Sequence, residues 1–199
     1  HLGGVRNWDY RYCWLRDAYY VVQALNRLGA ADMLENYLVY LRNLVELATR
    51  GDMAPPGGVS AQPELPGLAP GRPHARAGHI QPVYGVGLEP VLTEWTAPHL
   101  PGYRGIGPVR VGNQAHEHMQ HDVYGQIVLS TVQAFFDERL LRPATVDDFR
   151  ALEPIGERAF ELHDKPDASL WEFRGREAVH TYSSVMCWAA CDRLGNAAA

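Results

Sequence analysis

The chain has 199 residues, of which 46% are hydrophobic and 10% aromatic, enough for one compact core. Its 18 basic and 23 acidic residues give a net charge of −5 without a long run of either sign, so neither nucleic acid nor a membrane surface is a favoured partner. The three cysteines, Cys13, Cys187 and Cys191, include no CxxC pair, which predicts reduced thiols and neither a disulfide framework nor a metal site.

Two helices are predicted near the start of the chain. Polar and aromatic residues alternate over residues 7–17, and helical spacing then begins at residue 18 and continues to residue 28, with Gly29 as a C-terminal cap. Residues 31–50 form the second helix, with one apolar stripe made of Leu34, Leu38, Leu41, Val45 and Ala48. The short connection between them predicts an antiparallel helical hairpin.

The middle of the chain is poor in regular structure. Residues 51–79 are rich in proline and glycine, which predicts a long surface loop that is either a lid or binding wall or has no function. Residues 81–111 are expected to be irregular, with one short helix over residues 90–95.

Three helices are predicted in the C-terminal half. Residues 113–139 have the longest helical pattern. Thr145, with an acid at Asp148, predicts the N-terminus of a helix that reaches Phe160 or Leu162 and is kinked by Pro154. The last helix starts at Ser183 or Ser184 and stops before Gly195. Five or six paired helices and very few strands indicate an all-α protein that forms a single unit over residues 1–199.

A carboxylate between two aromatic residues is the first candidate for chemistry. Glu172 lies between Trp171 and Phe173 in a short segment between two helical patterns. Aromatic walls hydrate an ionised carboxylate poorly, so Glu172 could stay protonated near neutral pH and serve as a general acid. The alternative is a loop glutamate that points into water.

Histidines cluster at residues 116–121 without forming a metal motif. The HExxH pattern that begins at His116 needs a histidine at position 120, where the chain has Gln120. We therefore expect solvated or substrate-facing histidines at His118 and His121, and no metal. The sequence also lacks a P-loop and a GxSxG nucleophile motif, and it predicts no cofactor.

Several motifs together resemble the bacterial branch of glycoside hydrolase family 15, the glucoamylases and glucoamylase-type trehalases. The matching segments are RNWDYRYCWLRD at residues 6–17, GYRGIGPVRVGN at 102–113, QHDVYG at 120–125, DASLWEFR at 167–174, and SVMCW at 184–188. They follow the family's order along nearly the whole chain. The resemblance implies an (α/α)6 toroid of paired antiparallel helices, of which this chain would form a part.

The resemblance also implies roles for individual residues. Glu172 would be the general acid of an inverting, exo-acting α-glucoside hydrolase that acts on dextrin, maltose or trehalose. Arg16 and Asp17 would hold the hydroxyls of the terminal glucose, as their donor and acceptor chemistry allows. The remaining residues expected to line the substrate site are Tyr12, Trp14, Trp171, Arg174, Asn113 and Gln120.

Arg174 is two residues from Glu172 and would favour its ionised form if the two side chains met. We expect Arg174 either to pair with another acid, such as Glu177, or to turn toward the substrate.

The chain also departs from the family. The segment that supplies the family's general base is absent, as is the usual N-terminal β-sandwich, and His118 replaces a common glutamine. We therefore expect a fragment with the acid-bearing half of the toroid, in which Glu35, Glu89 and Glu94 are the internal candidates for a substitute base. The alternative is a non-hydrolytic module that binds sugar or a protein. Half a toroid would expose apolar helix faces, which predicts self-association. We expect a cytoplasmic location, since no secretory signal is recognisable.

Overall fold

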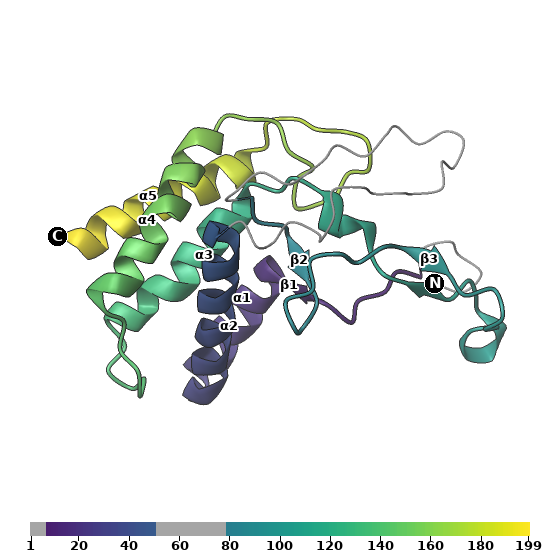
Figure 1. The fold of residues 1–199 in the computed structure, drawn as a ribbon, viewed down its shortest axis with the longest axis horizontal. Coiled ribbons are helices and arrows are strands. Elements are labelled where there is room, and N and C mark those ends of the chain that lie inside the picture. The colour runs from purple at the N-terminus through teal and green to yellow at the C-terminus, as the bar shows by residue number, and fades with distance from the viewer. Residues whose placement is uncertain (1–6, 51–78) are drawn as a thin grey trace.

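The structure is a computed structural model that describes residues 7–50 and 79–199 (Figure 1). Its described part contains five α-helices: α1 (Leu15–Arg27), α2 (Ala31–Arg50), α3 (Asp122–Val132), α4 (Val146–Leu162) and α5 (Thr181–Ala198). Short 3-10 helices cover Tyr103–Gly105 (η1), Gln114–Glu117 (η2) and Gln133–Phe135 (η3). The all-α class expected from the sequence is confirmed, while the assignment to part of an (α/α)6 toroid stays a prediction. The predicted loop over residues 51–79 lies outside the described residues, except for His79.

Strands are limited to four two-residue segments in the described part of the chain. β1 (Cys13–Trp14) pairs antiparallel with β2 (Val83–Tyr84), and β3 (Trp95–Thr96) pairs antiparallel with β4 (Arg110–Val111). The helices gather at one end of the molecule, and the irregular segments with β3 extend toward the other (Figure 1). The helix predicted over residues 90–95 is wrong, because residues 90–94 have no regular structure and Trp95 begins β3, which pairs with β4.

The first two helices form the predicted hairpin. α1 begins at Leu15, three residues before the prediction, directly after β1 fixes the preceding backbone. Leu28 and the left-handed Gly29 (φ 94°) end it, a conformation that glycine adopts without steric cost. α2 runs over the predicted residues, and its stripe of Leu34, Leu38, Leu41, Val45 and Ala48 is buried.

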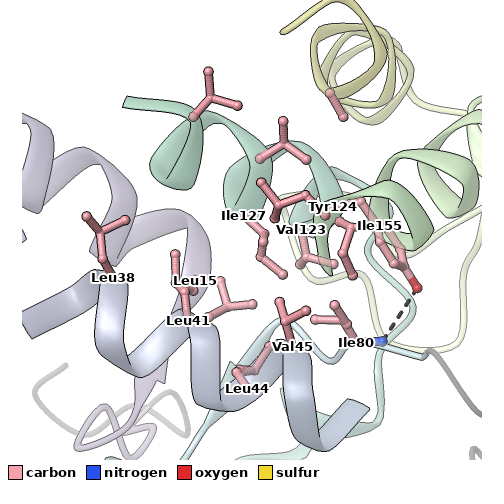
Figure 2. Close-up of a cluster of buried hydrophobic side chains, with 14 of the residues drawn as sticks. Leu15, Leu38, Leu41, Leu44, Val45, Ile80, Val123, Tyr124, Ile127 and Ile155 are labelled. Atoms are coloured by element: carbon pink, nitrogen blue, oxygen red, sulfur yellow. Dashed lines mark hydrogen bonds between the residues drawn. The ribbon is translucent and has the colours of Figure 1, made fainter. Parts of the chain in front are cut away.

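One hydrophobic core joins the helices (Figure 2). Leu15 of α1, Leu41 and Leu44 of α2, and Ile127 of α3 are each at most 1% exposed. The core reaches the irregular segment at Ile80, whose backbone N–H donates to the hydroxyl of Tyr124 at 3.5 Å. This contact ties the chain that leads into the site to the helical end.

The long helix predicted over residues 113–139 is wrong. The structure instead has η2, a break at residues 118–121, then α3 and η3. At the break, Met119 O accepts from Ala168 N (2.8 Å), and His121 N donates to Asp167 Oδ2 (2.8 Å). The backbone groups of the break therefore pair with the segment that precedes Glu172, and this pairing replaces helical hydrogen bonds.

α3 is buried on all sides. Ten of its eleven residues are buried, and it packs against α1, α4 and α5. Gly125 permits the close approach of α5, since a Cβ at this position would overlap the backbone carbonyl of Met186. α3 is therefore the centre of the helical end and not an amphipathic surface helix.

α4 has both of its predicted ends, whereas α5 extends beyond its prediction at both ends. Thr145 and Asp148 form the predicted capping box at the start of α4, which continues through Pro154 to Leu162. α5 begins at Thr181 and continues past Gly195 to Ala198, so its predicted stop is wrong. None of the described helices has the length and hydropathy to span a bilayer.

Candidate active site

The loop between α4 and α5 carries Glu172 and is anchored by the buried carboxylate of Asp167. Asp167 Oδ1 accepts from Ser169 N (3.0 Å), while Oδ2 accepts from His121 N (2.8 Å) and Ser183 Oγ (2.6 Å). The backbone of Asp167 also bridges to Ala178, which closes the loop at its base. One fully buried side chain thus ties the loop to the starts of both α3 and α5.

Glu172 lies in a strained backbone conformation. Its φ is +54°, and that of Ser169 is +65°, in the left-handed region that residues with a Cβ adopt at a cost of roughly 1–2 kcal/mol each. Hydrogen bonds from Glu172 N to Ser169 O (3.0 Å) and from Phe173 N to Ala168 O (2.9 Å) close this turn. Strain of this kind is common at functional sites, where the surrounding structure enforces it.

Three donors from two distant segments converge on one oxygen of Glu172. Trp14 Nε1 donates to Glu172 Oε1 at 2.7 Å, and Gln120 Nε2 does so at 3.5 Å. Arg16 Nη2 lies 3.9 Å from the same oxygen. The structure therefore brings together four of the residues predicted for the site: Glu172, Trp14, Arg16 and Gln120.

A pocket of about 550 Å³ opens beside Glu172. This volume falls within the range of roughly 300–1,000 Å³ that is typical of small-molecule sites. Aromatic side chains form much of its wall, and Glu172 is the only carboxylate that lines it among the described residues. The lining consists of Trp8, Tyr10, Asn113, Ala115, His118, Trp171, Glu172, Phe173 and Arg174.

The remaining predicted residues differ in their distance from this pocket. Trp171, Asn113 and Arg174 line it. Asp17 is next to Arg16 in the chain, but its side chain is exposed. Its carboxylate lies 4.0 Å from Arg16 Nε. Tyr12 lies outside the lining, and its hydroxyl donates to Asp9 Oδ2 (2.9 Å) and accepts from Gly112 N (3.1 Å).

Hydrogen bonds of Asp9 connect the N-terminal segment to residues 112 and 113, which precede η2. Asp9 Oδ2 accepts from Gly112 N (3.1 Å), and its backbone carbonyl accepts from Asn113 Nδ2 (3.0 Å). The Arg11 guanidinium beside Asp9 holds the pKa of that carboxyl well below its usual range. The ionised carboxylate of Asp9 accepts from Gly112 N and its backbone carbonyl accepts from Asn113, so Trp8, Tyr10 and Asn113 are held in one wall of the pocket.

Arg174 is occupied by a partner that the sequence did not indicate. Its Nη2 pairs with Glu94 Oε2 (2.9 Å), its Nη1 donates to Gln114 Oε1 (2.8 Å), and its guanidinium lies 4.2 Å from the ring centre of Trp8. Arg110 contacts the same ring at 4.8 Å and the same carboxylate at 3.0 Å. Arg174 therefore pairs with another acid, as one of the two alternatives predicted, but this acid is Glu94 and not Glu177, and it holds Arg174 at the rim of the pocket.

These contacts bear on the candidates for a substitute base. Burial opposes ionisation of Glu94, but hydrogen bonds from Arg174 and Gln114 N outweigh it and lower its pKa below 4.5. Glu35 accepts a hydrogen bond from Leu141 N, and Glu89 accepts one from Gly87 N (3.1 Å). None of the three carboxylates lines the pocket.

His118 faces the pocket as a neutral side chain. Burial lowers its pKa below 6.5, although the nearby Glu172 opposes this shift. In the described residues, no group of three or more His, Cys, Asp or Glu side chains could hold a metal ion. All three cysteines are free thiols, as predicted.

Three of the lining residues were not indicated by the sequence: Trp8, Tyr10 and Ala115. His118, expected to be solvated or to face the substrate, and Phe173, expected beside Glu172, both line the pocket. Trp8 and Tyr10 belong to the segment in which polar and aromatic residues alternate, and that alternation was the available signal. The sequence left two environments open for His118, and the break after η2 places it in the pocket wall.

Residues 77–199 match the model of glycosyl hydrolases family 15. The trehalase of Mycolicibacterium smegmatis is 32% identical over 190 residues, which are 96% of this chain and 24% of that protein. The trehalase of Mycobacterium tuberculosis is 31% identical with the same two shares, and that of Thermoplasma acidophilum is 30% identical over 96% of this chain and 27% of its own length. No solved structure matches significantly.

The chain thus spans about a quarter of the length of these relatives. The family match covers α3, α4, α5 and the loop that carries Glu172, so it includes the central elements of the site. By this match, the chain belongs to glycosyl hydrolases family 15.

Proposed function

We propose that the chain is the acid-bearing part of an inverting α-glucoside hydrolase that releases glucose from the end of its substrate. Glu172 is the general acid that protonates the glycosidic oxygen. The observation that carries this proposal is the convergence of Trp14, Gln120 and Arg16 on Glu172 Oε1 at the wall of an aromatic pocket. Fixed donors on one oxygen give the carboxyl group a single orientation, which general acid catalysis requires.

Trehalose is the proposed substrate, because several relatives at about 30% identity are named trehalases. Pocket residues such as Trp8, Tyr10 and Trp171 are suited to the apolar faces of sugar rings. In this proposal Arg16 and Asp17 bind hydroxyls, and the chain needs no metal or cofactor.

An inverting hydrolase also needs a base that activates water, about 6.5–9.5 Å from the acid. Since Glu172 is the only carboxylate lining the pocket in the described residues, that base would come from a part of the enzyme outside them. This observation also favours a second candidate function, a module that binds sugar without hydrolysing it.

Glucose release from trehalose, maltotetraose and isomaltose, with the product anomer followed by NMR, separates the two candidates. Inversion of trehalose yields one β-glucose and one α-glucose, because only the attacked anomeric carbon inverts. Glu172→Gln should lose turnover and keep sugar binding, since the amide oxygen can still accept from Trp14. Glu177→Gln, an exposed change in the same loop, is the matched control and should retain turnover. Full activity of Glu172→Gln contradicts its role as acid, and sugar binding by a chain without turnover supports the binding module.

We propose further that the chain self-associates through apolar residues exposed on α1 and α5. Tyr20 and Val21 of α1 and Val185 and Trp188 of α5 are each 49–62% exposed. Tyr20 and Tyr182 are joined by a hydrogen bond of 3.2 Å, which places the two helices on one surface. Sedimentation at micromolar concentration should show oligomers that Trp188→Lys weakens, whereas Leu141→Lys, in a loop, should not. A monomer in the wild type contradicts this proposal.

A further inference from the structure

A buried cation lies between two carboxylates behind the pocket. Arg16 Nη1 donates to Gln120 Oε1 (2.9 Å) and pairs with Asp122 Oδ2 (3.2 Å), while Arg16 Nη2 is 3.9 Å from Glu172 Oε1. The side chain of Asp122 is fully buried, that of Arg16 is 15% exposed, and that of Glu172 is 29% exposed. The guanidinium is therefore within hydrogen-bond distance of Asp122 but not of Glu172.

The ion pair with Arg16 is the interaction that accounts for the buried carboxylate of Asp122. Asp122 begins α3, but its side chain caps no backbone group among the described hydrogen bonds, and its Oδ1 has no hydrogen-bond partner among the described residues. Burial raises the pKa of Asp122, and the Arg16 guanidinium opposes this shift. The other polar groups around it are Asp167, Gln126, Tyr182 and Cys187. A carboxylate this deep in the protein is costly unless a cation pairs with it.

An acid catalyst must hold a proton, and a cation that closes onto it favours the ionised form. Among the described residues, Arg16 lies 3.9 Å from Glu172, His118 interacts with it electrostatically, and Arg174 lines the same pocket. Arg174 is paired with Glu94, and burial keeps His118 neutral. Arg16 is thus the cation whose position matters most for Glu172.

We propose that Asp122 is a positioning residue that holds Arg16 back from Glu172 and takes part of its positive charge. This inference rests on the proposed function, in which Glu172 donates a proton. With Arg16 held by Asp122 and Gln120, the donors reach Glu172 only at Oε1. Oε2 has no hydrogen-bond partner among the described residues and is free to carry the proton.

The indole N–H of Trp14 provides a direct probe. It donates to Glu172 Oε1 at 2.7 Å, so its ¹H–¹⁵N NMR signal should follow the ionisation of Glu172 as the pH changes. In the 199-residue chain, Asp122→Asn should move the midpoint of this titration to lower pH by about one unit, because the charge of Arg16 is then no longer shared with a second carboxylate. Glu172→Gln should abolish the titration, which establishes its origin.

Asp17→Asn is the matched control. It removes an equal charge near Arg16, but this charge is 70% exposed and 4.0 Å from Nε, so water screens it and the midpoint should stay in place. An unchanged midpoint in folded Asp122→Asn, or an equal shift in Asp17→Asn, overturns the inference.

A double-mutant cycle distinguishes positioning from direct repulsion between the carboxylates. Arg16→Gln should raise the midpoint, and adding Asp122→Asn to it should cause no further change, because Asp122 acts through Arg16. The double variant also removes both buried charges, so the comparison is available if Asp122→Asn alone fails to fold. A lower midpoint in the double variant than in Arg16→Gln contradicts the proposal. The titration needs no turnover, so its result stands apart from the test of hydrolysis.

Discussion

Trp14 and Glu172 are joined by a hydrogen bond of 2.7 Å although 158 residues separate them in the chain. Trp14 is 8% exposed and belongs to β1, which β2 holds in place. Its ring packs with Val83, Leu92 and Ala115. The orientation of the candidate acid therefore depends on the packing of the N-terminal segment.

Trp14→Phe should preserve most of this packing and remove the donor. A hydrogen bond to a charged group contributes about 1.5–3 kcal/mol, so we expect glucose release from trehalose to fall tenfold or more if turnover is present. Trp188→Phe makes the same substitution on the exposed face of α5 and should leave the rate unchanged. Equal rates in Trp14→Phe and wild type would show that this hydrogen bond does not orient Glu172.

Gly125→Ala should destabilise the fold. The added methyl group would overlap the carbonyl of Met186 where α3 and α5 pack, at an expected cost of about 1–3 kcal/mol. Gly195→Ala, within α5, meets nothing within 4 Å and should stabilise the protein by roughly 0.5–1 kcal/mol through its helix propensity. Urea denaturation of both variants checks these opposite signs, and a stabilised Gly125→Ala would contradict the close packing of the two helices.

Glu94→Gln should lower the free energy of unfolding by about 2 kcal/mol at pH 7, because two guanidinium groups lose their shared carboxylate. The pKa of Glu94 is lowered in the folded state, so its contribution is present above pH 4.5 and is lost as the pH falls through the lowered value. The difference between variant and wild type should therefore shrink below pH 4.5. Urea denaturation at several pH values measures it, with Glu161→Gln as the control for a more exposed ion pair. A difference that stays constant down to pH 3 would contradict the assignment.

His118 should make the fold less stable in mild acid. Burial lowers its pKa, so below pH 6.5 the unfolded chain binds a proton that the folded chain does not, and the free energy of unfolding falls as the pH decreases. His118→Gln should reduce this fall between pH 7 and pH 5, whereas His99→Gln, at an exposed position, should not. If the free energy of unfolding had the same pH dependence in His118→Gln and the wild type, the imidazole of His118 would be exposed to solvent and not buried.

Local signals in the sequence were sufficient to predict the elements that are determined by residues close to one another in the chain. The apolar stripe over residues 31–50 gave the bounds of α2, and Thr145 with Asp148 gave the start of α4. The segment around Glu172 was also found, because its composition differs from the helices on both sides. In each case the interacting residues lie within a few positions of one another.

The rest required contacts between distant segments. The break at residues 118–121 could not be predicted, since Asp167 and Ala168 bind its backbone groups from 46 and 49 residues away. The sequence predicted an acid partner for Arg174 but could not identify it, because Glu94 is 80 residues away while Glu177, the example considered, is three. The sequence by itself determined the helical class, the family motifs and the identity of the candidate acid. Only the tertiary structure decided which donors hold Glu172 and which carboxylate holds Arg16, because those energies depend on distance and burial, and residue order specifies neither.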